Sequence, residues 1–277
     1  MEFAYRIGHL RAEGAYAVLA RAQALEAQGR EITPLEIGQP DFETYANIAL
    51  AGVRAITGGQ TRYNPPAGLP ALRRVLAEDA GLRRGMAFSP EQVVIAPGAK
   101  PLLLLPMLAL LERGDEVLYP DPGFPSYEAA IGLVGATPVP IPLLEEEGYD
   151  LDLEALDARI GARARMVILN SPSNPTGGIL SPRTLGHVSE LARRRDLWVL
   201  SDEIYVRLVY EGSAPSIAVL PGMAERTIIA DGFSKTYAMT GWRLGFGIMP
   251  APLAAKMELL LTHSVGCTAT FTQYAGL

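Results

Sequence analysis

The feature that most constrains the fold is an alternation of short apolar runs with longer helical stretches. The runs contain few charged side chains, which is typical of strands that are buried on both faces of a sheet. Helical stretches between successive strands indicate strand–helix–strand units, which build parallel sheets. We expect strands at 93–96, 116–119, 137–141, 166–169, 198–200, 227–230 and 244–248. The sequence therefore predicts an α/β fold with a mainly parallel sheet and helices on both faces.

Helices are expected before and between these strands. The stretch 11–29 is rich in helix-forming residues and ends at a glycine, and its expected apolar face consists of Val18, Leu19, Ala22 and Leu25. Further helices are expected at 45–57, from Pro70 onward, from about 101, and at 128–134, 153–160 and 182–195. Residues 35–42 predict a short extended segment that ends in a turn, and a plain loop between two domains is the alternative.

Composition excludes several classes of protein and site. The 277 residues carry a formal net charge of −6 and no basic cluster, so nucleic acid is not an expected partner. The single cysteine, Cys267, excludes an internal disulfide framework, and neither the cysteine nor the scattered histidines predict a metal site. The N-terminus lacks the pattern of a signal peptide, and the apolar run 102–111 is too short to cross a membrane. We expect a soluble, cytoplasmic protein.

One lysine, Lys235, requires a chemical explanation. It follows Ser234, and Arg243 comes eight residues later, in a segment flanked by apolar runs. Burying an unpaired ammonium costs free energy, so such a lysine should be paired, neutral or covalently used. A neutral amine can form a Schiff base with a carbonyl, while a hydroxyl and a guanidinium suit a phosphate. Pyridoxal 5'-phosphate has both an aldehyde and a phosphate, so it is the leading hypothesis for a cofactor, with Lys235 as the catalytic residue.

Other candidate residues follow the predicted strands directly. In open parallel sheets, ligands bind outside the carboxyl ends of the strands, where the loops after different strands meet. The residues in question are Gly98, Phe124, Asn174, Asp202 and Lys235. Their convergence on one edge of the sheet is a stronger indication of a ligand site than any one of these short motifs.

Pyridoxal phosphate requires a specific partner at each of its groups. The phosphate would bind to Ser234, to Arg243 and to the backbone of Gly98, Ala99 and Lys100, where a strand turns into a helix. Asp202 would keep the ring nitrogen protonated, while its neighbour Glu203 should point the other way if the strand geometry continues.

The cofactor ring needs two further kinds of neighbour. Asn174 and Tyr205 would donate to the ring oxygen, and Phe124 would stack on the ring. Each residue also has a structural alternative. Asp202 could cap a helix, Asn174 could shape a turn, Tyr205 could belong to the core and Phe124 could pack under a loop.

Three motifs resemble the class I and II aminotransferases, which are fold-type I enzymes that use pyridoxal phosphate. The most specific is Ser234-Lys235 followed by Gly-Trp-Arg-Leu-Gly at 241–245. The others are Ser-Asn-Pro-Thr-Gly at 173–177 and Ser-Asp-Glu-Ile-Tyr at 201–205. The resemblance runs from about Glu36 to the last residue. It implies ping-pong transfer of an amino group between an L-amino acid and a 2-keto acid, through a Schiff base on Lys235.

The resemblance also implies features that the residues alone do not indicate. Gly38 and Asn174 would bind substrate, with Gly38 near its carboxylate. Tyr63 would reach the cofactor phosphate of a partner subunit, which implies a homodimer, and the bond Asn174-Pro175 would be cis. Residues 1–43 would form the N-terminal piece of a small domain, and 44–277 the large cofactor-binding domain.

Family members continue beyond the position that matches Leu277, with a C-terminal small domain that carries an arginine for the substrate carboxylate. We therefore expect a C-terminally truncated chain that binds cofactor, transaminates poorly and exposes an apolar face. Three alternatives stay open. They are a carbon–sulfur β-lyase of the same fold, a cofactor-sensing regulatory domain, and a cofactor-binding fragment without activity. The regulatory domains of this fold carry a basic DNA-binding region, which the sequence lacks.

Overall fold

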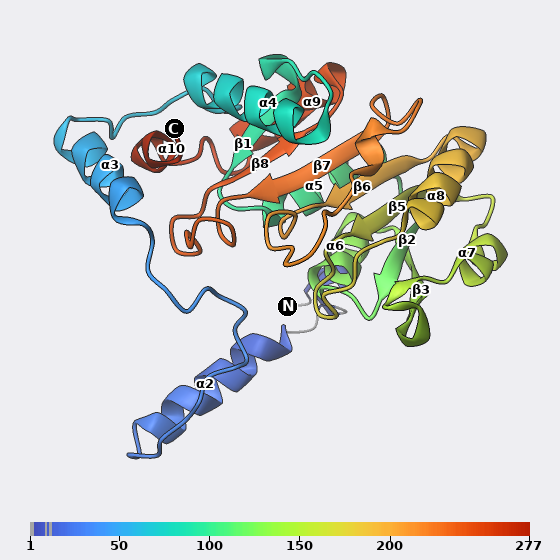
Figure 1. Ribbon diagram of the computed structural model, residues 1–277, viewed down its shortest axis with the longest axis horizontal. Coiled ribbons are helices and arrows are strands. Elements are labelled where there is room, and N and C mark those ends of the chain that lie inside the picture. The colour runs from blue at the N-terminus through green and yellow to red at the C-terminus, as the bar shows by residue number, and fades with distance from the viewer. Residues whose placement is uncertain (1–2, 9, 11–12) are drawn as a thin grey trace.

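The computed structural model describes residues 3–8, 10 and 13–277, and its centre is a single sheet flanked by helices (Figure 1). The strands are β1 (Val93–Ala96), β2 (Glu116–Asp121), β3 (Thr137–Leu144), β4 (Asp150–Leu151), β5 (Ala164–Asn170), β6 (Trp198–Asp202), β7 (Thr227–Gly232) and β8 (Gly245–Ile248). Their order is β1-β8-β7-β6-β5-β2-β3-β4. The pairs from β7 to β3 are parallel, whereas β8 runs antiparallel to both of its neighbours and β4 runs antiparallel to β3. The predicted mainly parallel sheet is confirmed.

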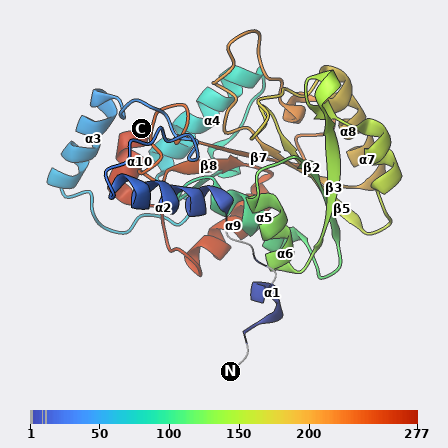
Figure 2. The same cartoon turned by 90° about the horizontal axis from the view of Figure 1, so that it is seen from below.

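Helices cover both faces of this sheet, as predicted (Figure 2). The helices are α1 (Tyr5–Gly8), α2 (Gly14–Glu26), α3 (Ala46–Thr57), α4 (Pro70–Arg84), α5 (Lys100–Leu110), α6 (Ser126–Val134), α7 (Leu153–Arg159), α8 (Pro182–Arg195), α9 (Ala251–Thr262) and α10 (Thr270–Gly276). One face packs against α5, α6 and α9, and the other packs against α4, α7 and α8.

The alternation of side chains along each strand explains why the strands are apolar throughout. In β1, Val94 and Ala96 enter the core under α5, while Val93 and Ile95 enter the core under α4. All four side chains are fully buried. Because both faces of the central strands are covered by helices, such a strand has no face toward solvent for polar residues, and polar side chains such as Asn170 and Asp202 come at its end.

The N-terminal region differs in part from expectation. Helix α2 lies within the predicted 11–29, of which residues 11 and 12 lie outside the described part of the chain. It extends away from the sheet (Figure 1), and its predicted apolar face is only half covered. Val18 is 52% exposed, because it lies about 100° around the helix from the half-buried Leu19. Residues 35–42 are an irregular loop with two bends, so the predicted extended segment is wrong there.

Strand β8 approaches the turn between β1 and α5 closely, and this contact requires a glycine. Gly245 pairs with Ala96 of β1 and with Gly232 of β7. A Cβ atom at Gly245 would lie 2.6 Å from the carbonyl oxygen of Gly98 and 2.7 Å from the backbone nitrogen of Ala99. Both atoms belong to the backbone, so a side chain at this position would have to displace the turn.

We predict that Gly245→Ala lowers the free energy of unfolding by about 1–3 kcal/mol, because the methyl group overpacks a rigid backbone contact. Gly186→Ala is the matched control. It lies within α8 in open space, and it should stabilise the chain by about 0.5–1 kcal/mol through helix propensity. Urea unfolding followed by circular dichroism measures both. A Gly245→Ala chain as stable as the wild type would contradict this prediction, because it would show that the turn moves aside at little cost in free energy.

Candidate functional site

The carboxyl ends of β1, β2, β5, β6 and β7 lie at one edge of the sheet, and the antiparallel β8 begins there. Most of the predicted site residues therefore meet at this edge. They are Gly98, Ala99, Lys100, Phe124, Asn174, Asp202, Tyr205, Ser234, Lys235 and Arg243. Register places Asn170, Asp202 and Ala230 side by side on three neighbouring strands.

The sequence contains three lysines, and their surroundings differ. Lys256 is exposed on α9, and Lys100 forms an ion pair with Glu13 at 2.7 Å. Lys235 is half-buried on the turn between β7 and β8, with its ammonium 5.9 Å from the centre of the Tyr205 ring. Burial lowers the pKa of Lys235, and the positive charge of Arg243 lowers it further. Both effects favour a neutral, nucleophilic amine at Lys235.

Asp202 is a buried carboxylate at the end of β6, with 5% of its surface exposed. Its Oδ2 accepts a hydrogen bond of 2.7 Å from the hydroxyl of Tyr127, and its Oδ1 accepts one of 3.3 Å from the backbone of Ile204. Burial raises the pKa of Asp202 to about 6, and these two hydrogen bonds oppose that rise. A protonated ring nitrogen would give a cationic partner to this carboxylate, which forms no ion pair among the residues that the structure describes.

Tyr127 is a site residue to which the sequence assigns no role. It is fully buried in the first turn of α6, and its ring meets that of Phe124 edge-on at a centroid distance of 5.7 Å. It is separated from Asp202 by 75 residues, so no local motif could reveal the pair.

Asn170 is a second missed residue, and it connects two predicted ones. Its Oδ1 accepts a hydrogen bond of 2.7 Å from the backbone nitrogen of Asn174, and its Nδ2 donates to the carbonyl of Asp202 at 3.0 Å. Burial raises the pKa of Tyr205, and the Asp202 charge raises it further, whereas a hydrogen bond with Asn174 lowers it. The bond Asn174-Pro175 is cis, as expected.

A hollow of about 530 Å³ opens beside Asn174 and Tyr205. Its wall also includes Pro172, Ile179 and the segment 208–211, so it is largely apolar. Both Asn174 and Tyr205 are therefore accessible to a molecule in solution.

The turn between β1 and α5 has the features of an anion site. The backbone N–H of Gly98 donates to the carbonyl of Ala96 at 2.8 Å, so the predicted role of this N–H in binding a phosphate is not supported. The N–H groups of Ala99 and Lys100, at the start of α5, are the ones left for an anion. The guanidinium of Arg243 lies against Gly98, where a Cβ atom would come within 2.8 Å of Arg243 Cζ. Arg243 donates from Nη1 to the carbonyl of Thr240 at 3.0 Å, and Ser234 lies half-buried on the same loop as Lys235. This donor set fits the charge of a phosphate group.

The remaining predicted residues Phe124, Gly38 and Tyr63 have different surroundings. The Lys100 ammonium lies 5.2 Å from the centre of the half-buried Phe124 ring, so a cation contacts the ring expected to stack on the cofactor. The carbonyl of Gly38 accepts a hydrogen bond from the Lys235 ammonium, so this loop does reach the site. Tyr63 is 96% exposed on the loop between α3 and α4, and its side chain is not brought into the site of its own chain.

Two further properties concern the described residues as a whole. No group of three or more histidine, cysteine, aspartate or glutamate side chains among them could hold a metal ion. No helix in this part of the chain has the length and apolar character needed to cross a membrane.

The raised pKa of Asp202 makes stability depend on pH in a predictable direction. The folded chain holds this proton more tightly than the unfolded chain does, so the contribution of Asp202 to stability falls as pH rises from about 4 to about 6. Asp202→Asn removes the titration. Relative to the wild type, this variant should gain on the order of 2 kcal/mol across that window. Urea unfolding of the cofactor-free chain at several pH values measures the difference, and a difference independent of pH would contradict the assignment.

Comparison with known proteins gives a consistent result. The sequence model of "Aminotransferase class I and II" matches residues 30–277. Arginine–pyruvate transaminase AruH of Pseudomonas aeruginosa is 42% identical over 87% of this chain, and aromatic-amino-acid aminotransferase 2 of Thermococcus litoralis is 40% identical over 90% of it. The chain spans 61% and 65% of the lengths of these two relatives.

A solved structure agrees with these sequence matches. Aspartate aminotransferase from Thermus thermophilus with maleate superposes with a TM-score of 0.95 at 34% identity, over 99% of this chain and 72% of that one. Enzymes of the matched family use pyridoxal phosphate. The family match, the two relatives and the shared fold lead to one conclusion, that the chain belongs to the class I and II aminotransferases.

Proposed function

We propose that the chain binds pyridoxal phosphate at the carboxyl edge of the sheet and transfers amino groups between an L-amino acid and a 2-keto acid. The observation that carries the proposal is the environment of Lys235. Of the three lysines, it is the half-buried one with a lowered pKa, and it lies on the edge that also holds Asp202, Tyr205 and Arg243.

When bound, pyridoxal phosphate supplies an aldehyde for an amine and a ring that takes up the electron pair left when the substrate α-carbon loses a proton. Asp202 holds the proton at the ring nitrogen, and Tyr127 keeps the carboxylate of Asp202 in place through its 2.7 Å hydrogen bond. Asn174 and Tyr205 donate to the ring oxygen, while Phe124 covers the ring. The turn at Gly98–Lys100, Ser234 and Arg243 bind the phosphate.

Lys235 has two tasks in this proposal. Its amine is the partner of the cofactor aldehyde, and once released it accepts the α-proton of the amino acid and later returns it as an acid. Both tasks need an amine that is neutral near pH 7, which is the direction in which burial and Arg243 shift its pKa. The Gly38 carbonyl accepts a hydrogen bond from Lys235, which supports a role for that loop in contacting the substrate.

The amino donor is proposed only as a class, the L-amino acids. The names of the relatives point to arginine, aromatic amino acids and aspartate, so family membership does not select among these side chains.

We also propose that two copies of the chain associate. Tyr63 is almost fully exposed on a loop beside α3, where a second copy could receive it. The outward side of α3 exposes Leu50, Val53 and Ile56, which lie three residues apart and so form one apolar stripe. Such a stripe is suited to burial against another subunit.

The division into residues 1–43 and 44–277 is likewise a proposal. Helix α2 extends from the rest of the chain (Figure 1), and polar contacts tie the first segment to the site. Glu13 pairs with Lys100, and Gly38 accepts from Lys235. This arrangement supports a first segment that belongs to a separate unit and closes one side of the site.

A scan of amino donors tests the function. The purified chain is incubated with pyridoxal phosphate, and each L-amino acid is added while the visible spectrum of the bound cofactor and the released keto acid are recorded. At least one donor should change the spectrum and yield keto acid. Lys235→Ala should lower this turnover by at least about a hundredfold, because the proton acceptor is lost.

Lys256→Ala is the matched control, since this lysine is exposed on α9 and should behave as the wild type. Cofactor binding without a response to any donor would contradict amino transfer. Full turnover in Lys235→Ala would contradict the assignment of the lysine.

A further inference from the structure

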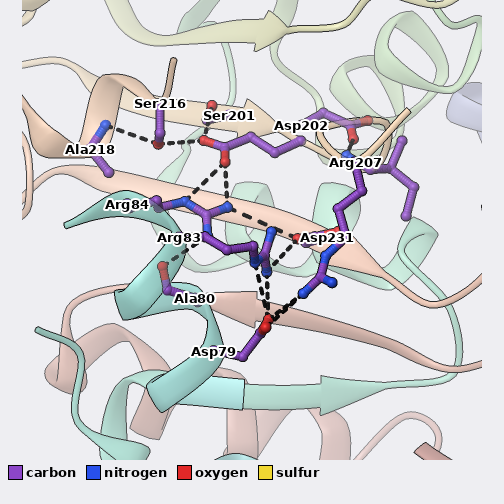
Figure 3. A network of polar contacts seen from close by, with 12 residues as sticks. Asp79, Ala80, Arg83, Arg84, Ser201, Asp202, Arg207, Ser216, Ala218 and Asp231 are labelled. Carbon is purple, nitrogen blue, oxygen red and sulfur yellow. Dashed lines mark hydrogen bonds and ion pairs between the residues drawn. The ribbon is translucent and has the colours of Figure 1, made fainter. Parts of the chain in front are cut away.

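Behind the site, on the face of the sheet that packs against α4, lies a network of charges whose centre is buried and whose outer part reaches the surface (Figure 3). It consists of three arginines and three carboxylates, namely Arg83, Arg84, Arg207, Asp79, Glu203 and Asp231. The positive and negative charges balance. The catalytic roles proposed above use none of these side chains.

Arg84 is the centre of the network. Its Nε donates to Oε2 of Glu203 at 3.1 Å, and its Nη2 contacts the same oxygen. The same Nη2 lies 3.9 Å from Oδ2 of Asp231. The three side chains are between 3% and 5% exposed, so solvent contributes little to holding these charges. Among the described residues, Arg84 is the one whose ion pairs join Glu203 to Asp231.

The two carboxylates are held at both of their oxygens. Oε1 of Glu203 accepts hydrogen bonds from Ser201 at 3.0 Å and from Ser216 at 2.6 Å. Oδ1 of Asp231 accepts one of 2.7 Å from the backbone of Gly232, and Arg83 lies 3.6 Å from its Oδ2. Because each carboxylate is held at both of its oxygens, a movement of Arg84 would also move the backbone of Glu203 and of Asp231.

That backbone belongs to the site. Glu203 is the residue directly after Asp202, and its nitrogen donates to the carbonyl of Ala230 on the next strand at 2.8 Å. Asp231 lies on β7, four residues before Lys235. Arg84 therefore connects the strand end that carries Asp202 to the strand end that leads into Lys235.

We propose that Arg84 is a positioning residue, which sets the placement of Asp202 relative to Lys235 by pairing with Glu203 and Asp231 from behind the sheet. The proposal rests on the proposed function, because the ring nitrogen and the aldehyde of pyridoxal phosphate are a fixed distance apart on a rigid ring. A site for this molecule needs its acid and its amine at a matching separation, to within about 0.5 Å. Small shifts of either strand end would disturb both contacts.

The variants separate two possible roles of Arg84, which are to position the two strand ends and to balance the buried negative charges. Arg84→Met leaves two buried carboxylates with one arginine fewer, so it changes both properties. Arg84→Met/Glu203→Gln removes one charge of each sign and restores the balance, but the link between the strands stays broken. Arg84→Lys keeps the charge and loses the forked geometry. Arg74→Met, on the exposed side of α4, is the matched control.

Three quantities are measured for each variant. The first is the thermal unfolding midpoint of the cofactor-free chain. The second is the pH at which Lys235 becomes half reactive toward an acylating reagent, followed by peptide mass spectrometry with Lys256 as an internal reference. The third is the dissociation constant of pyridoxal phosphate. The second measurement needs no cofactor, so it tests Arg84 even if the proposed function fails.

Arg84→Met should lower the unfolding midpoint, raise the reactivity midpoint of Lys235 by at least about half a pH unit, and weaken cofactor binding about tenfold or more. The double variant should regain much of the unfolding midpoint and keep the other two changes. Arg84→Lys should unfold near the wild-type temperature with intermediate shifts, and Arg74→Met should match the wild type throughout. If Arg84→Met does not fold, the double variant and Arg84→Lys decide the question.

Wild-type reactivity and cofactor affinity in the double variant would overturn the proposal, because they would mean that Arg84 only balances charge. Unchanged values in Arg84→Met would overturn it as well. A wild-type chain that does not bind pyridoxal phosphate would instead contradict the proposed function, while the reactivity of Lys235 would still report on Arg84.

Discussion

The rest of the site depends on two consecutive carboxylates at the end of β6, which are held on opposite faces of the sheet. Side chains alternate across a strand, so the consecutive carboxylates of Asp202 and Glu203 point to opposite faces of the sheet. Asp202 meets Tyr127 on the face covered by α6, and Glu203 meets Arg84 on the face covered by α4. One strand end thus belongs to two polar clusters, of which the first forms the site and the second fixes the backbone under it. Glu203 could not change sides without breaking its buried ion pair with Arg84, and Asp202 could not do so without leaving the buried hydroxyl of Tyr127 without its acceptor.

The parallel arrangement of the central strands extends this constraint to the other residues. Because β5, β6 and β7 run in the same direction and in register, Asn170, Asp202 and Ala230 form a row, and the loops beyond them leave the sheet together. Strand β8 then returns antiparallel to β7, so the loop that joins the two strands stays at this edge and carries both Lys235 and Arg243. The absence of a side chain at Gly245 lets the turn between β1 and α5 lie directly against this return.

Most of the fold and much of the candidate site could be predicted, because the information is local. Apolar runs between helices indicate buried strands, and Asp202, Asn174 and Lys235 follow such runs directly. Two of the residues that were missed act over long separations. Tyr127 meets Asp202 across 75 residues and Arg84 meets Glu203 across 119, so periodicity and short motifs carry no trace of either pair. The predicted face of α2 is only partly covered for a related reason, since packing partners decide which side of a helix is covered, and Val18 is 52% exposed.

The central claim is that one lysine, Lys235, bonds to the cofactor, and the small number of lysines makes it directly measurable. The wild-type chain is incubated with pyridoxal phosphate, reduced with borohydride to fix the carbon–nitrogen bond, digested, and mapped by mass spectrometry. Only the peptide that contains Lys235 should carry the cofactor mass, at close to one per chain, with Lys100 and Lys256 unmodified. Label spread over all three lysines, or its absence from Lys235, would contradict the account.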